Sequence, residues 1–88
     1  MNRLTRTVFL TAGDRVRFRR NDGPFDFGTI ILASQNGVSL AIAPDEGKVK
    51  LSNGFSMVHL LLIVDYSAGT ARDTTGTEWD IGLCLPAH

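Results

Sequence analysis

The chain has little that could cross-link it covalently or place it in a membrane. It contains one cysteine, Cys84, which has no partner for an internal disulfide and cannot build a multi-cysteine metal site. No apolar run reaches the roughly 20 residues that a membrane-spanning helix needs, and the N-terminal segment lacks the apolar core of a signal peptide. We therefore expect a cytoplasmic protein without membrane contact, metal or cofactor, stabilised by packing alone or by packing and oligomerisation.

The sequence also lacks net charge, but its charges are unevenly distributed. Nine basic and nine acidic residues balance over the 88 residues. Residues 1–20 hold six arginines and one acidic residue, whereas residues 21–88 hold three basic and eight acidic residues. Such a division is typical of a basic arm that binds an anionic partner, or of neighbouring strands that pair through opposite charges. The second arrangement is the commoner one.

Motifs of enzyme chemistry are missing as well. The sequence has no phosphate-binding glycine loop, nucleophile elbow or paired metal-ligand motif. His59 lies inside an apolar run and His88 ends the chain, and neither is spaced from Cys84 in a way that indicates a catalytic pair. We predict no catalytic residue. An enzyme with its site at a subunit interface is kept as the second alternative function, because pores between symmetric small barrels can be catalytic without a motif.

What the sequence does contain is a regular series of turns of the β type. Clusters with glycine recur along the chain, and Asn36-Gly37 suits the positive φ angles of a tight hairpin turn. Short runs rich in Val, Ile, Leu, Phe and Thr lie between them, and none has the period of an amphipathic helix. We predict one all-β domain over residues 1–88, with a core barrel over about residues 7–66 and a C-terminal hairpin over about residues 69–84. Trp79 lies on the apolar face of that hairpin and is expected to be packed.

Two segments resemble the opening hairpin of Src-homology-3-type small barrels. They are G-D-R-V-R-F at residues 13–18 and F-G-T-I at residues 27–30. Tudor, KOW and nitrile-hydratase β-like domains share this opening. The resemblance covers roughly residues 13–65 and implies a five-stranded SH3-like barrel, to which the C-terminal hairpin is added. It implies an architecture and not a function, because many unrelated functions use this barrel.

The order of elements is also similar to that of the type II dihydrofolate reductases of plasmids and integrons. Members of that family are small barrels that assemble into a tetramer around one pore, which a Val-Gln-Ile-Tyr strand lines. The nearest segment here is V-K-L-S at residues 49–52, in which Lys50 and Ser52 replace the functional glutamine and tyrosine. The reductase activity is therefore not implied. The resemblance implies a small self-associating barrel from a bacterial mobile element, such as an integron cassette, or from a phage.

Four arginines are the best candidates for an anion-binding or nucleic-acid-binding surface. Arg15, Arg17 and Arg19 alternate along one predicted strand and share a face, and Arg20 follows at the loop. Guanidinium groups about 7 Å apart along a strand suit phosphate oxygens, which accept bidentate hydrogen bonds. A nucleic-acid-binding module is therefore the first alternative function. It is less favoured than pairing of these arginines with acidic side chains, because the whole chain is neutral.

The loop N-D-G-P-F-D-F after these arginines supplies two aromatic candidates for contact with a ligand or partner, Phe25 and Phe27. Aromatic side chains of this kind stack on nucleic-acid bases. Asp22 and Asp26 in the same loop would repel phosphate, which weakens the nucleic-acid hypothesis. Packing at the mouth of the barrel is the alternative role of the two phenylalanines.

An acidic cluster lies in the predicted C-terminal hairpin. Its members are Asp73, Glu78 and Asp80. They lack the dense spacing of oxygen ligands found in a calcium-binding loop. We expect these side chains to form a solvated face or to pair with the arginines.

The run from Met57 to Val64 has more apolar side chains than one barrel interior can bury. Alternate residues of a strand face opposite sides, so only one set can fill the interior. We predict that the other set lies in the interface of a homo-oligomer, either a dimer or a tetramer. The predicted interface residues are Met57, Leu61 and Ile63. These observations favour a non-enzymatic binding or assembly module.

Overall fold

The computed structural model describes residues 9–84, and this part of the chain contains eight strands and no helix. The strands are β1 (Arg15–Arg19), β2 (Asp26–Ala33), β3 (Ser39–Pro44), β4 (Val49–Lys50), β5 (Ser56–Met57), β6 (Leu60–Asp65), β7 (Thr70–Arg72) and β8 (Glu78–Leu83). The predicted all-β class is confirmed. Arg3, Arg6 and the predicted start of the barrel at residues 7–8 lie outside the described residues.

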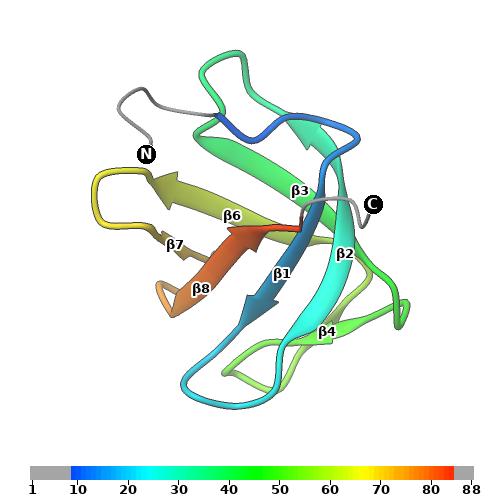
Figure 1. The fold of residues 1–88 in the computed structure, drawn as a ribbon. Helices are drawn as coiled ribbons and strands as arrows, with labels where there is room; N and C mark the ends of the chain where they lie inside the picture. The colour runs from blue at the N-terminus through cyan, green and yellow to red at the C-terminus, as the bar shows by residue number, and fades with distance from the viewer. Residues whose placement is uncertain (1–8, 85–88) are drawn as a thin grey trace.

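Six of the strands form a closed antiparallel barrel in the order β1-β2-β3-β6-β7-β8 (Figure 1). The C-terminal hairpin is a part of this barrel and not an addition to it. β7 pairs with β6, and β8 pairs with β1, as Figure 1 shows by the orange-red strand beside the blue one. Without the hairpin, β1 and β6 would each present an open edge of unpaired backbone groups.

Two differences from the predicted five-stranded barrel are therefore found. The first is that β7 and β8 belong to the barrel, and the second concerns the segment around Val49. The segment around Val49 does not join the barrel but pairs with β5 in a separate two-stranded sheet. Val49 and Leu51 of this segment are nevertheless buried in the common core. In the turn that follows, the Ser52 hydroxyl lies 2.8 Å from the hydroxyl of Thr77, a residue of the segment between β7 and β8. The small hairpin is therefore attached to the barrel through both apolar packing and hydrogen bonding.

The core consists of the inward-facing residues of the barrel strands together with Leu10, which precedes β1, and with Val49 and Leu51 from β4 and its following turn. Its largest fully buried side chains are Val16, Phe18, Ile30, Ile42, Leu60 and Leu62. Trp79 is only 2% exposed, as expected, and its ring centroid lies 5.9 Å from that of Phe18. Burying each such side chain contributes about 1.5–3 kcal/mol relative to leaving it exposed. The interior is thus filled by one face of each strand.

A β-bulge in β2 changes which side chains face outward. The register with β3 runs from the pair Ile30↔Ile42 directly to the pair Leu32↔Ala41, so Ile31 is the extra residue. Because a bulge interrupts the alternation of a strand, Ile31 and Leu32 both point away from the core. The bulge therefore places a second large aliphatic side chain on the barrel exterior.

Candidate interaction surfaces on the barrel exterior

An apolar face covers the outside of β2, β3 and β6. Leu32 pairs with Ala41, and Ala41 pairs with Leu61, so these three residues form one row across the sheet. Ile63 follows two residues along β6 and lies between Ser39 and Arg72 of the neighbouring strands. Leu32, Leu61 and Ile63 are 68%, 46% and 55% exposed. We call this row, with Ile63, the apolar face.

The apolar face is hollowed along its middle. A groove of about 520 Å³ is lined by residues that include Leu32, Ser39, Ala41, Leu61, Ile63 and Arg72. Ala41 has a short side chain, whereas its neighbours on both strands have long ones, so the groove lies above Ala41 between two aliphatic rims. A surface of this shape can receive an apolar ridge from a partner.

Two of the three predicted interface residues, Leu61 and Ile63, lie on this face. The burial pattern of β6 alternates as expected, with Leu60, Leu62 and Val64 inside. Met57 is separated from β6 by a bend at residues 58–59, belongs to β5 and packs partly against the core. It therefore does not share the exposed row of the other two.

Leu32 and Ala41 belong to the apolar face, although neither was among the interface residues predicted from the sequence. Leu32 would face the interior in a regular strand that contains Ile30, since residues two apart share a face. The bulge reverses that expectation. The only signal in the sequence was the uninterrupted aliphatic run I-I-L at residues 30–32, which offers more side chains than one face can hold.

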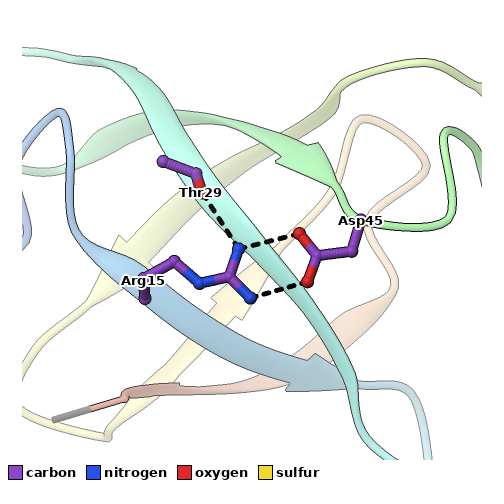
Figure 2. A network of polar contacts seen from close by, with 3 residues as sticks. All are labelled: Arg15, Thr29 and Asp45. Carbon is purple, nitrogen blue, oxygen red and sulfur yellow. Dashed lines mark hydrogen bonds and ion pairs between the residues drawn. The ribbon is translucent and has the colours of Figure 1, made fainter. Parts of the chain in front are cut away.

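Arg15, the first arginine of β1, forms an ion pair with Asp45, which lies in the turn after β3. Arg15 donates two hydrogen bonds to the Asp45 carboxylate, at 2.7 and 2.6 Å, and a third to the Thr29 hydroxyl (Figure 2). This bidentate contact is the geometry in which guanidinium and carboxylate bind most specifically. The hydrogen bonds from Arg15 hold the pKa of Asp45 below its ordinary value. Both side chains are about half exposed, so the contact orients the arginine more than it stabilises the fold.

The third arginine is also held within the fold. The Arg19 Nε donates to the Asp80 carboxylate at 3.2 Å, and one of its terminal nitrogens donates to the Gly23 carbonyl at 3.3 Å. Its guanidinium lies 4.2 Å from the centre of the Phe25 ring. Arg15 and Arg19 therefore both pair with acidic side chains. This is the arrangement that the sequence analysis favoured for these arginines over phosphate binding.

Arg17 and Arg20 contact aromatic rings instead. The Arg17 guanidinium lies 4.7 Å from the Phe25 ring centre, and that of Arg20 lies 5.6 Å from the ring centre of Trp79. Phe25 is half-buried by these contacts, whereas Phe27 lies exposed on β2 directly opposite Arg17. The two predicted aromatic candidates thus lie beside the arginines, but they do not form a common stacking platform.

The described part of the chain has neither a cluster of metal-ligating side chains nor a membrane-spanning helix. Within residues 9–84, no group of three or more His, Cys, Asp or Glu side chains is placed to hold a metal ion. The same residues include no helix of the length and apolarity needed to cross a membrane.

Comparison with known proteins gives no relative for this chain. No family model matches it, and neither a curated protein nor a solved structure is significantly similar to it. The closed barrel of short antiparallel strands is consistent with the SH3-like architecture.

Proposed function

We propose that this protein is a non-enzymatic assembly and binding module that forms a homodimer through its apolar face. The observation that carries the proposal is the apolar groove between Leu32 and Leu61 on the outside of a barrel whose interior is already filled. Exposed aliphatic side chains that form a contiguous, hollowed surface are typical of an interaction site. An 88-residue domain without disulfides gains a large share of its stability by covering such a surface.

A second copy of the chain is the occupant that best suits this face. In a two-fold interface the same patch meets itself, so like charges at its centre would repel each other. The rows that cross β2, β3 and β6 carry Leu, Ala, Ser and Ile at their centre, with Arg72 only at the edge. The aliphatic rims and the groove over Ala41 occur on the same face, so each copy can offer a ridge to the other's groove.

The oligomeric state, the origin and the non-enzymatic role rest on separate observations. One two-fold surface predicts a dimer, whereas a tetramer would require a second apolar face. The similarity in element order to the pore-forming barrels of plasmids and integrons supports self-association and an origin in a bacterial mobile element or phage. A surface whose exposed side chains are mainly aliphatic favours assembly over catalysis.

The proposal predicts that wild-type protein has twice the 9.6 kDa mass of one chain in light scattering at tens of micromolar. Ile63→Lys should reduce the mass to that of one chain, because it would bury a lysine opposite Arg72 in each half of the two-fold interface. The matched control is Val58→Lys, since Val58 is 58% exposed and Ile63 is 55% exposed, and Val58 does not line the groove. This control should remain dimeric.

Two outcomes would contradict the proposal. The first is a wild-type protein that is monomeric throughout this concentration range. The second is an Ile63→Lys variant that keeps both the mass and the melting temperature of the wild type. Circular dichroism of both lysine variants shows whether the barrel is intact, so that loss of the dimer can be separated from loss of the fold.

A further inference from the structure

A second hollow lies on the opposite side of the barrel from the apolar face. Its volume is about 260 Å³, and Arg17, Arg19, Phe25, Asp80 and Gly82 are among its lining residues. In the barrel order β1-β2-β3-β6-β7-β8, strands β1 and β8 lie opposite β6 and β3. We call this hollow the arginine pocket. A dimer formed through the apolar face would leave it open to solvent.

Gly82 creates the space that the arginine pocket occupies. It is paired with Arg17 across β1 and β8, and a Cβ atom added to it would lie 3.3 Å from the Arg17 Nε. The Arg17 side chain therefore passes over a position of β8 that has no side chain of its own. Phe25 contacts the guanidinium from the loop after β1. Arg17 is therefore positioned by the Phe25 ring and by the open space above Gly82, and not by an acidic residue.

The charges around the pocket do not balance. Arg19 is paired with Asp80, and Arg15 further along the strand is paired with Asp45. Among residues 9–84, the structure shows neither an ion pair nor a hydrogen bond from the Arg17 guanidinium. Its cross-strand neighbours, Phe27 and Gly82, are both uncharged. The pocket therefore contains two guanidinium groups and one carboxylate.

We propose that the arginine pocket binds a single carboxylate, supplied by an acidic side chain of a partner protein. A guanidinium that stacks on an aromatic ring keeps its N–H edge free, and this edge matches the two oxygens of a carboxylate. Contact with Phe25 restricts the Arg17 side chain before binding, which reduces the entropy lost on binding. One carboxylate balances the excess charge of the pocket, whereas Asp80 repels the second charge of a phosphate. The proposal does not depend on dimer formation.

The test uses NMR titration of the full-length protein with two blocked peptides at equal ionic strength. The probes are acetyl-Gly-Glu-Gly-amide and the same peptide with glutamine in place of glutamate. The glutamate peptide should cause saturable shifts of the Gly82 amide resonance, and the glutamine peptide should not. Acetate tests whether a free carboxylate suffices, and it should bind more weakly than the peptide. Inorganic phosphate should also bind more weakly.

Three variants connect the shifts to the pocket. Arg17→Gln should weaken binding roughly tenfold or more, because it removes the charged donor. Gly82→Ala should also weaken binding although it leaves every charge in place, since the added methyl group occupies the hollow. Arg72→Gln, on the apolar side of the barrel, should bind as the wild type does. Well-dispersed spectra show that each variant is folded.

Several results would overturn the proposal. They are the absence of a saturable shift, equal responses to the two peptides, tighter binding of acetate or phosphate than of the glutamate peptide, or equal losses in Arg17→Gln and Arg72→Gln. Because the readout is local to β8, it is independent of the mass measurement that tests the dimer. A monomeric protein that binds the glutamate peptide would refute only the proposed dimer, and a dimer that ignores the peptide would refute only the pocket.

Discussion

At the scale of single residues, Asp73 organises the turn between β7 and β8. It is 7% exposed, and its carboxylate accepts hydrogen bonds from the Thr75 amide, the Thr75 hydroxyl and the Thr77 amide. Its second oxygen accepts the Trp79 Nε1–H at 2.8 Å. The expectation of a solvated acidic cluster is therefore wrong for this residue. Its carboxylate instead satisfies the only polar atom of a buried tryptophan side chain.

Two opposing effects act on the pKa of Asp73. Desolvation by burial raises the pKa, but the hydrogen bonds from Thr75, Trp79 and Thr77 together outweigh it and leave the pKa below its ordinary value. The folded state therefore binds the proton less readily than the unfolded state does. Asp73 contributes stability at pH values above the unfolded pKa of 3.8, and this contribution is lost as the pH falls through the lower folded pKa.

We predict that Asp73→Asn lowers the free energy of unfolding at neutral pH by about 1–3 kcal/mol. The asparagine side chain has one acceptor oxygen and one NH₂ donor. The NH₂ group would face another donor, either the Trp79 Nε1–H or the Thr75 and Thr77 amides, and one of these hydrogen bonds would be lost. Urea unfolding followed by tryptophan fluorescence measures this loss. The difference between variant and wild type should be constant well above pH 3.8 and should shrink as the pH falls below that value, because the unfolded wild type then takes up a proton that the folded state binds less readily.

Glu78→Gln provides the control for this prediction. Glu78 is an exposed carboxylate in the same hairpin, and its substitution should change stability by less than about 0.5 kcal/mol. Equal stability of Asp73→Asn and Glu78→Gln at neutral pH would contradict the role assigned to Asp73. So would a loss in Asp73→Asn that persists unchanged at pH 3.

At the scale of elements, hydrophobic alternation predicted the faces of regular strands. β1 and β6 expose and bury alternate residues as the sequence indicates, because a strand that covers a filled interior must follow a period of two. The bulge at Ile31 could not be predicted in this way, since it depends on how β2 matches β3. The closure of the barrel by β7 and β8 was missed because alternation does not show which strands become neighbours.

The candidate sites were predictable to a similar degree. Alternation identified Leu61 and Ile63 as outward-facing, and it placed Arg15, Arg17 and Arg19 on one face. The partners of these arginines required the folded chain, because Arg15 and Asp45 are 30 positions apart and Arg19 and Asp80 are 61 apart. The arginine pocket depends on Gly82, whose role is apparent only when β8 lies beside β1.

Gly28 fixes how closely β2 approaches β3. A Cβ atom at this position would lie 2.6 Å from the Ala43 carbonyl oxygen and 2.9 Å from the Ile42 Cγ2. Because the first of these atoms belongs to the backbone, the strand itself would have to shift. We predict that Gly28→Ala lowers the free energy of unfolding by about 1–3 kcal/mol, as overpacking does in other cores. Urea denaturation measures the change.

Gly23→Ala is the matched comparison for Gly28→Ala. A Cβ atom at Gly23 would meet only the Arg20 carbonyl oxygen at 3.7 Å, an ordinary contact distance. This variant should unfold within about 0.5 kcal/mol of the wild type. If the two alanine variants were equally stable, the close approach of β2 and β3 would not be a constraint on residue 28.

At the scale of the whole molecule, the exterior divides into an apolar side and a charged side. The apolar face covers β2, β3 and β6, and the arginine pocket lies between β1 and β8 on the opposite side of the closed barrel. The uneven distribution of charge along the sequence is partly cancelled in space, because Asp45 and Asp80 pair with two arginines of the basic strand. Folding thus brings two acidic residues from the remainder of the chain against the basic strand.

This cancellation predicts that the protein does not bind duplex DNA at physiological salt. Polyanion binding depends on releasing counterions through several free Lys or Arg contacts. Here Arg15 and Arg19 already contact carboxylates, and Asp22 and Asp26 flank the loop beside them. The protein should therefore elute early from a heparin column and should show no saturable binding to duplex DNA at about 150 mM salt.

Releasing the two arginines should create the affinity that the wild type lacks. The double variant Asp45→Asn/Asp80→Asn frees Arg15 and Arg19 on the face that also holds Arg17, and it should elute from heparin at higher salt. Asp22→Asn/Asp26→Asn changes the net charge equally, although neither aspartate forms an ion pair with another residue of the described range 9–84. Its retention should increase less, because the paired arginines remain occupied.

Equal retention of the two double variants would show that net charge alone governs binding. Tight binding of DNA by the wild type, lost when Arg15, Arg17 and Arg19 are replaced by serine, would instead establish the arginine face as a nucleic-acid interface.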